Sequence, residues 1–300
     1  MARFLVPDRL DTSERVQRTV MLLGRRGYAL SPPRLAQVCI GGVVAEADVR
    51  WAVAARPGLA IENGLVMLED DRPRAGAIAA RSEVHELEAP PYRAMTEQFV
   101  RALVAVAPFI RSVAIAGSLA SGGFKASDDV DLNLIVDDGH RHLAYVAVNA
   151  LGVVHALRHR SKPVDDLTRR PLAPRLMTAN LILERSQCHP LARQDEDMAF
   201  ELLMSQPLFG HDVFDEVIDS NPGLMEHFPQ LARKLRHADP RPMGSRLPVW
   251  LFPSALDGIA RWIGGGAWRY MQWTRRHRPE ALARVEFVRR TMRPYTLFDT

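Results

Sequence analysis

Cysteine and lysine are both scarce in this chain of 300 residues. Its two cysteines, Cys39 and Cys188, lie far apart, and neither has a CxxC or a Cys/His spacing. A disulfide framework and a structural zinc site are therefore not expected. Three of the 39 basic residues are lysines and the other 36 are arginines. We attribute this excess to a codon bias toward GC-rich codons, so it is no evidence for phosphate binding.

Long apolar segments are also missing. The richest stretch, 249–273, is interrupted by Pro253, Asp257, Arg261 and Arg269, so we expect no membrane span and no membrane partner. The first 16 residues lack the apolar core of a signal peptide. These absences predict a cytoplasmic protein.

The composition is that of a folded protein. Hydrophobic residues make up 47% and charged residues 25% of the chain, which excludes disorder of the whole chain. The length predicts two or three domains. A net charge of +4 is compatible with a nucleotide or nucleic-acid partner without requiring one.

The first 72 residues have the pattern of three helices and a hairpin. The helices are expected at about 12–24, 31–41 and 45–55, and two apolar runs flank Asn63-Gly64, a strong hairpin signal. This order resembles a winged-helix domain. The third helix would then contact DNA, but Glu46 and Asp48 oppose phosphate contacts, so a scaffold or partner-docking role is favoured and DNA binding is the alternative.

The next segment, 73–107, is interpreted as a linker followed by a helix. Its first part is charged, rich in alanine and ends in Pro90-Pro91, which indicates a linker or a short solvated helix. From Tyr92 to Val106 the apolar residues recur with helical spacing.

The residues that point to chemistry follow in 108–190. A short apolar strand pattern, 112–117, leads into Gly117-Ser118, and 11 positions after Ser118 comes the sequence Asp129-Val130-Asp131. Side chains two apart on a strand share a face, so both carboxylates point the same way. Two such carboxylates repel each other unless a cation lies between them, and they suit Mg²⁺ that also holds phosphates. Gly117 allows close approach of the backbone, and Ser118 can donate to phosphate oxygens.

This block resembles the DNA polymerase β-type nucleotidyltransferase superfamily, whose pattern is a strand, Gly-Ser, about a dozen residues and then Asp-x-Asp. The resemblance implies that Asp129 and Asp131 are catalytic and hold Mg²⁺ (or Mn²⁺), and that Gly117 and Ser118 bind the nucleotide. Asp128 lies where Ser or Thr is common and is expected to cap the turn.

The resemblance extends more loosely to chains of similar length that carry a winged helix before the Gly-Ser turn. The corresponding later positions are Asn180, Ala199, Glu201, Pro207, Leu208, Gly210 and Asn221. The implied fold class is α/β (α+β), with a small mixed-sheet nucleotidyltransferase core at 108–190, an N-terminal winged-helix domain at 1–72 and a helical C-terminal region at 191–300.

A third carboxylate of the superfamily is not evident here. The strand where it is expected carries Asn180, which cannot act as a general base. Glu184 shares the alternation of Asn180 and is the other possible third position, and Asp165 and Asp166 are further candidates. Glu201 is expected to face the nucleotide or another helix.

Two other sets of residues have structural and functional interpretations. His140 and His142 begin a helix or, less favoured, bind metal, and the basic run at 158–162 is a solvated loop or a contact for phosphate. The C-terminal third interleaves arginines with Trp262, Trp268, Tyr270 and Trp273. We expect the aromatic rings to pack inward and the arginines outward, with a nucleic-acid surface as the alternative.

The predicted function is transfer of a nucleoside monophosphate from an NTP, such as ATP, to an acceptor, with release of pyrophosphate. The acceptor, a small molecule, a tRNA or a protein, is not specified by the sequence. One alternative is a weakened nucleotide-binding or winged-helix regulatory protein, motivated by Asn180. A toxin-type nucleotidyltransferase that modifies tRNA or protein is another.

Overall fold

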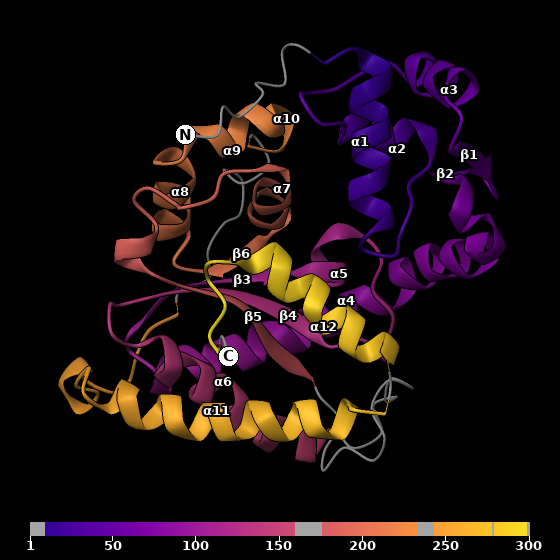
Figure 1. Cartoon of the computed structure of the whole chain (residues 1–300). Coiled ribbons are helices and arrows are strands. Elements are labelled where there is room, and N and C mark those ends of the chain that lie inside the picture. The colour runs from indigo at the N-terminus through magenta and orange to yellow at the C-terminus, as the bar shows by residue number, and fades with distance from the viewer. Residues whose placement is uncertain (1–9, 160–175, 233–242, 278, 299–300) are drawn as a thin grey trace.

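The computed structural model describes residues 10–159, 176–232, 243–277 and 279–298. It is a mixed α/β chain with a four-stranded sheet at its centre (Figure 1). Within the described ranges, no helix is both long enough and apolar enough to cross a membrane.

The N-terminal unit, residues 12–68, has the elements expected from the sequence. They are α1 (Thr12–Gly24), α2 (Pro32–Gln37), α3 (Glu46–Ala55), β1 (Leu59–Glu62) and β2 (Leu65–Leu68). The side chain of Asp11 accepts a hydrogen bond of 2.6 Å from the backbone N–H of Glu14, which fixes the start of α1. Asn63 and Gly64 both have positive φ, 49° and 74°, so the hairpin predicted there is confirmed.

One long helix covers the segment that was interpreted as a linker or short helix followed by a second helix. After a 3₁₀ segment, η2 (Glu69–Arg74), α4 runs without a break from Ala75 to Val106 and includes Pro90 and Pro91. Proline removes a helical hydrogen bond and normally ends a helix. Here the N-terminal half of α4 is held from outside, because Arg81, His85 and Glu88 all hydrogen bond to the loop at 123–128. Of the two expectations for the segment before Tyr92, a linker or a short solvated helix, the structure has a helix, and it continues into the helix predicted after Tyr92.

The central sheet has the strand order β5-β4-β3-β6. Its strands are β3 (Ile110–Ala116), β4 (Val130–Val136), β5 (Met177–Glu184) and β6 (Gln206–Phe209). β4 runs parallel to β5, whereas β3 is antiparallel to both β4 and β6, so the sheet is mixed as predicted. β6 lies within 191–300, the region expected to be helical, so that expectation was wrong for these four residues. Gly210 follows it with a φ of 64°, and a Cβ there would lie 1.8 Å from the Arg111 carbonyl oxygen.

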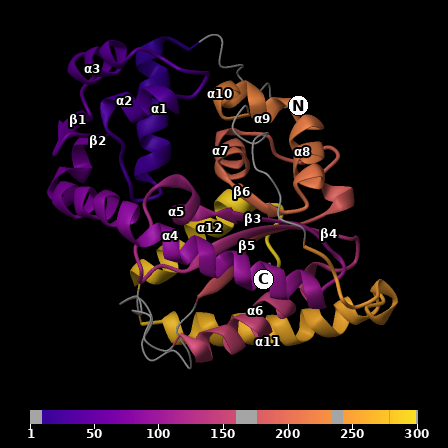
Figure 2. The same cartoon turned by 180° about the vertical axis from the view of Figure 1, so that it is seen from behind.

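The sheet separates two apolar cores. On one face it packs against α4 and α6 (Arg141–Arg158), with Phe99, Leu132 and Val148 in the same buried cluster. On the other face Ala114, Ile135 and Leu181 join a cluster that includes both the N-terminal unit and α7 (Glu196–Met204). Apolar residues of the N-terminal unit thus belong to the same buried cluster as residues of the sheet and of α7. Seen from behind, this unit lies at one side of the sheet, where α4 begins (Figure 2).

The remaining helices surround the sheet. η3 (Arg185–Gln187), α8 (His211–Asp219), α9 (Pro222–His227) and α10 (Pro229–Ala232) lie near α7, and η5 (Val249–Leu251), α11 (Leu256–Arg275) and α12 (Pro279–Met292) complete the C-terminal part. α11 packs along α6 at one edge of the molecule, and α12 crosses in front of the sheet (Figure 1). Buried Asn221 ties α8 to the preceding loop, because its amide donates to the carbonyl oxygens of Cys188 and Val217.

The aromatic residues of α11 differ from the expectation. Trp262, Tyr270 and Trp273 are 76%, 52% and 57% exposed, and among the aromatics of this helix Trp268 is the one that turns inward, to the cavity described below. The prediction that these rings pack inward was wrong for the three exposed residues. Apolar residues lie on more than one face of α11, and only one face meets α6.

Candidate functional site

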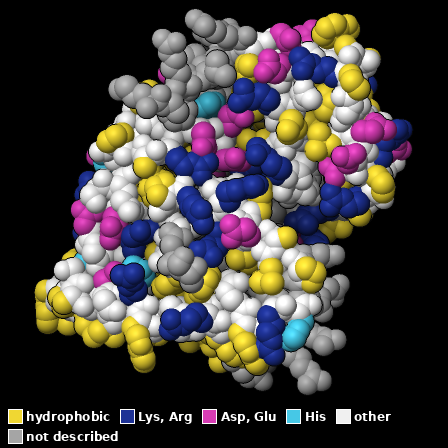
Figure 3. Space-filling model, viewed as in Figure 1, with side chains coloured by type: hydrophobic (Ala, Val, Ile, Leu, Met, Phe, Trp, Pro, Cys, Tyr) yellow, Lys and Arg dark blue, Asp and Glu magenta, His cyan; other side chains and the backbone are white. Residues whose placement is uncertain are grey.

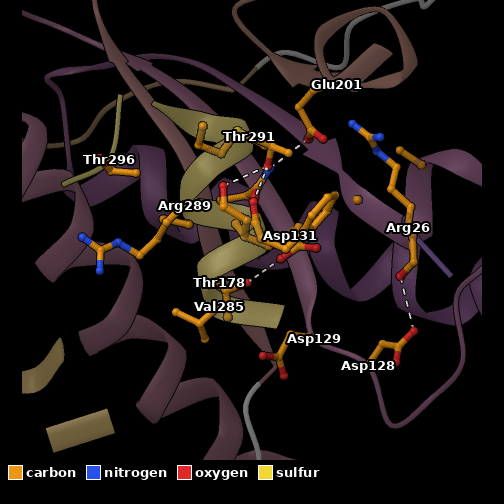
Figure 4. Close-up of a pocket in the computed structure, with 18 of the residues that line it drawn as sticks. Arg26, Asp128, Asp129, Asp131, Thr178, Glu201, Val285, Arg289, Thr291 and Thr296 are labelled. Carbon is orange, nitrogen blue, oxygen red and sulfur yellow. Dashed lines mark hydrogen bonds between the residues drawn. The ribbon is translucent and has the colours of Figure 1, made fainter. Parts of the chain in front are cut away.

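A cavity of about 570 Å³ opens on the α7 side of the sheet, where β4 begins (Figure 4). Its floor is formed by the short helix α5 (Gly117–Ser121) and by the starts of β4 and β5. The loop at 25–28 of the N-terminal unit forms one wall, and α11, α12 and residues 295–298 form the opposite wall. The cavity therefore collects residues from both ends of the chain.

The four residues that the sequence motif singled out all line this cavity. They are Gly117, Ser118, Asp129 and Asp131. β3 ends at Ala116, which pairs with Asp131 of β4, so the turn after β3 lies beside the start of β4. The antiparallel pairing of two adjacent strands brings together residues that are 11 or more positions apart in the sequence.

Gly117 is required at this place by its neighbour. Its φ is +59°, and a Cβ on it would lie 2.2 Å from Oδ2 of Asp131. Any other residue would strain the backbone and displace the carboxylate. The glycine of the motif therefore gives Asp131 its position.

Asp131 and Asp129 differ in their surroundings. Asp131 is the second residue of β4, and its Oδ1 accepts a hydrogen bond of 2.8 Å from the Thr178 hydroxyl of β5. Asp129 precedes the strand rather than lying within it as expected, and its side chain still lies on the cavity (Figure 4). One carboxylate is thus held by a strand partner, and the other lies at the end of a loop.

These two carboxylates fit a divalent metal only in part. Carboxylate oxygens are the donors that Mg²⁺ prefers, and Mg²⁺ usually takes one or two of them together with water and substrate phosphates. Among the described residues there is no group of three or more His, Cys, Asp or Glu side chains that could hold a metal ion. Asp129 and Asp131 therefore suit a metal that arrives with a phosphate ligand, not one enclosed by protein groups.

Asp128 has a structural part in the loop. It is 6% exposed, and its Oδ2 accepts a hydrogen bond of 2.6 Å from Arg81 of α4. The same oxygen accepts from the Ser118 hydroxyl and the Lys125 backbone N–H, both at 3.3 Å. The expectation that Asp128 caps the turn agrees with these contacts. Arg81 was missed, although Arg81, His85 and Glu88 have the spacing of one helix face.

Glu201 of α7 is a nearly buried carboxylate that lines the cavity (Figure 4). Its Oε1 accepts hydrogen bonds from the amides of Asn133, at 3.2 Å, and Asn180, at 2.8 Å. The backbone of Gly117 also hydrogen bonds to it. Burial raises the pKa of Glu201, while the positive charge of Arg26 and these hydrogen bonds oppose the rise. The carboxylate thus connects α7 to both strands and to the glycine turn.

The two possible third positions are in different places. Asn180 lines the cavity and binds Glu201, whereas Thr178 is the β5 residue that pairs with Asp131. Glu184 pairs with Val136 at the far end of β4 and accepts a hydrogen bond from the Gly139 backbone. Glu184 is therefore not a third carboxylate of this cavity. Asp165 and Asp166 lie outside the described residues.

His140 and His142 are engaged away from the cavity floor. The ring of His140 contacts the carbonyl oxygens of Asp138 and Phe252, and His142 Nδ1 is 2.7 Å from Oδ2 of Asp257. Both residues fasten the start of α6 to the segment that begins α11. These contacts agree with the polar helix start that was favoured over metal binding. In the basic run at 158–162, residues 160–162 lie outside the described part.

Arginines and aromatic rings complete the walls. Arg25, Arg26, Arg81 and Arg289 line the cavity, as do the rings of Tyr28, Tyr145, Phe200, Trp268, Phe287 and Phe298. Burial raises the pKa of Tyr28 to about 12, so its phenol is neutral. The guanidinium of Arg289 lies 5.3 Å from the ring centre of Trp268. The cavity thus combines positive charge, an acidic pair and flat apolar surfaces.

Comparisons with known proteins gave no match. Neither the family models, nor the curated proteins, nor the solved structures contain a significant relative of this chain.

Proposed function

We propose that this protein is a metal-dependent nucleotidyltransferase of the DNA polymerase β type, with an N-terminal winged helix. The observation that carries the proposal is the meeting of Gly117, Ser118, Asp129 and Asp131 at the floor of one cavity. The four belong to a single sequence motif, and the walls around them offer arginines for phosphates and rings for a base.

The proposed reaction joins an acceptor hydroxyl to the α-phosphorus of an NTP. A new P–O bond forms, the bond to the bridging oxygen of the β-phosphate breaks, pyrophosphate leaves, and the hydroxyl proton passes to water. A divalent metal, when bound, would neutralise charge on the phosphate oxygens. Asp129 and Asp131 would hold it, and Gly117 and Ser118 would hold the phosphates.

The contacts of the floor explain how these residues would stay in place. Thr178 orients Asp131, and Arg81 fixes the loop through Asp128. Glu201 holds the backbone at Gly117 from below. Such preorganisation matters in phosphoryl transfer, where the protein mainly positions charged groups.

A direct test measures nucleotide transfer. The full chain is incubated with labelled NTPs, Mg²⁺ or Mn²⁺ and a panel of small-molecule, tRNA and protein acceptors. We expect Asp129→Ala and Asp131→Ala each to lower the rate by at least about a hundredfold, because the metal loses a ligand. Glu184→Ala, a carboxylate of β5 away from the cavity, is the matched control. Equal transfer by the double variant Asp129→Ala/Asp131→Ala would reject the proposal.

A second candidate function is nucleotide binding with weak turnover. The observation that favours it is that β5 presents Thr178 and Asn180, not a carboxylate, beside Asp131. Calorimetry separates the two candidates. Micromolar NTP binding without pyrophosphate release on any acceptor of the panel would support the second one, and release above the level of the double variant would exclude it.

A further inference from the structure

The outward face of α11 carries a regular apolar seam. Ile259, Ile263, Gly266, Tyr270 and Trp273 follow one another at steps of four, three, four and three residues. The exposed fractions of the side chains are 58% for Ile259, 49% for Ile263, 52% for Tyr270 and 57% for Trp273. Alternation of steps of four and three is the pattern by which one helix packs along another. We call these five residues the α11 seam.

The seam is not needed to hold α11 in the fold. The opposite face of the helix contacts α6, with Ala260 buried and Gly264 against the rings of Tyr145 and Phe298. α11 lies along one edge of the molecule, and hydrophobic side chains gather along that edge in the surface view (Figures 1 and 3). Exposed Trp250 at 77% and Val249 at 43%, from η5, precede the helix. A contiguous exposed apolar face of this kind marks an interaction site.

We propose that the α11 seam binds the α11 seam of a second copy of this chain, in an antiparallel, two-fold symmetric pair. In such a pair, a residue that lies a given distance along its helix from the two-fold axis faces a partner residue that lies at the same distance from that axis. Gly266 is the middle residue of the seam, with Ile259 and Trp273 equally far from it along the chain. Pairing about Gly266 places Ile259 against the partner's Trp273, a small residue against a large one, and the bare glycine allows the two helices to approach closely.

The charges beside the seam fit this partner. Arg269 lies on the same flank of the helix as Trp262, so the antiparallel arrangement brings it next to the partner's Trp262, where a cation–π contact can form. Arg276 already lies 4.0 Å from the ring centre of Trp273. Asp257, the acidic residue of α11, is occupied by His142 and the backbone of Leu143. Arg269 would thus gain an aromatic partner across the pair, whereas Arg276 already has one within its own helix.

A nucleic acid fits the same face less well. Ile259 and Ile263 add nothing to base stacking, and Tyr270 and Trp273 already stack on each other, with ring centres 6.1 Å apart and planes at 25°. Aliphatic side chains at regular helical steps instead favour a helix as the occupant.

The test is the mass of the chain in solution. One chain has a mass of 33.6 kDa, and light scattering during gel filtration should give twice this value for the full wild-type chain. Gly266→Glu places a charge at the centre of the seam and should reduce the mass to one chain. A Cβ at Gly266 meets no atom within 4 Å, so the monomer itself accommodates the change.

Gly258→Glu is the matched control. It introduces the same residue in the same helix, also with no atom within 4 Å of the Cβ, but outside the seam. It should leave the mass at two chains. Trp262→Ala should weaken self-association by at least tenfold, whereas Trp51→Ala, at an exposed tryptophan of α3, should not change it. Circular dichroism checks that every variant is folded.

Three results would overturn the proposal. One is a mass of a single chain for the wild type at about 100 µM, a concentration at which micromolar dimers are formed. Another is a Gly266→Glu chain that stays paired, which would place the contact elsewhere. The third is a single wild-type chain that binds phosphatidylserine vesicles or a labelled oligonucleotide in a Trp262-dependent way, which would assign the seam to a lipid surface or to nucleic acid.

Discussion

The two walls of the cavity differ in the contacts that are most prominent at each. The N-terminal wall is held by charged pairs: Arg26 Nη1 lies 3.0 Å from Oδ1 of Asp197 in α7, and Arg81 binds Asp128. The C-terminal wall is held by rings, with Tyr145 and Phe298 5.1 Å apart at the contact between α6 and residues 295–298. Neither wall relies on one kind of contact alone. Apolar residues of the N-terminal unit also share a buried cluster with α7, and the C-terminal wall has polar contacts such as that of His142 with Asp257.

The outer surfaces of the two regions differ as well. On α3 the exposed Arg50 pairs with Glu46 of the same helix, and Arg56 binds Asp11, Ser13 and Gln17. On α11 the exposed seam is apolar, with arginines beside it. The two regions therefore differ in what they expose, paired charges on α3 and apolar side chains on α11. The scaffold interpretation of the N-terminal unit stays a prediction, and association through α11 stays a proposal.

The largest effect is expected from breaking the polar attachment. Asp197→Ala leaves Arg26, whose side chain is 14% exposed, without its carboxylate partner. Removing one member of a buried ion pair costs about 3–5 kcal/mol because the other charge stays desolvated. We expect a loss of about 3 kcal/mol in the free energy of unfolding, measured by urea denaturation. A loss below about 1 kcal/mol would show that this pair does not fasten the N-terminal wall.

The apolar attachment should be broken by a smaller change. In Gly264→Ala the new Cβ would lie 2.9 Å from Cζ of Phe298 and 3.1 Å from Cδ1 of Tyr145. Overpacking of this kind costs about 1–3 kcal/mol, more than the gain of about 1 kcal/mol from replacing glycine in a helix. Thermal unfolding should show a net loss of about 1–2 kcal/mol. Gly258→Ala, with open space around the Cβ, should instead be stabilising.

The contact between His142 and Asp257, which fastens α6 to α11, should depend on pH. Burial raises the pKa of Asp257, but hydrogen bonds from His142 and the Leu143 backbone outweigh it and hold this pKa below the usual value of 3.8. The contact therefore stabilises the fold above about pH 4 and is lost as the pH falls through the lowered pKa. Asp257→Asn should cost about 1 kcal/mol at pH 7. The difference from wild type should shrink below pH 3.8, and a difference independent of pH would contradict this account.

The smallest effect is expected at the exposed pair of α3. Arg50 and Glu46 have side chains 56% and 43% exposed, so Arg50→Ala should change the free energy of unfolding by about 0.3 kcal/mol. If the unit is a scaffold, the variant should also leave binding to a labelled DNA duplex at low salt unchanged. A salt-dependent loss of DNA affinity in this variant would favour the regulatory interpretation.

The sequence predicted what depends on nearby residues. The Asn63-Gly64 turn and the short strand before Gly117 follow from residues within a few positions of each other, and both are present. The α4 helix could not be predicted in the same way. Pro90 and Pro91 argue locally for a break, and the contacts that keep the helix intact come from a loop about 40 positions away.

The sequence predicted the motif residues of the candidate site, but not the residues that hold them in place. Gly117, Ser118, Asp129 and Asp131 were identified because their order and spacing resemble a nucleotidyltransferase motif. Their partners come from other elements, Thr178 from β5 and Glu201 from α7. The order of elements along the chain does not predict which residue of a later strand will lie beside Asp131.

By itself, the sequence of this protein determined the local turns, the strand pattern and the acidic pair that follows Gly117-Ser118. Only the tertiary structure decided that residues 25–28 and α12 would enclose that pair, that Glu184 would lie at the far end of β5, and that α11 would turn its seam outward. The physical reason is that burial is a property of contacts between distant segments. A helix with apolar residues on two faces can pack either face against the core. The shape of the surface on which the helix packs decides which face is buried.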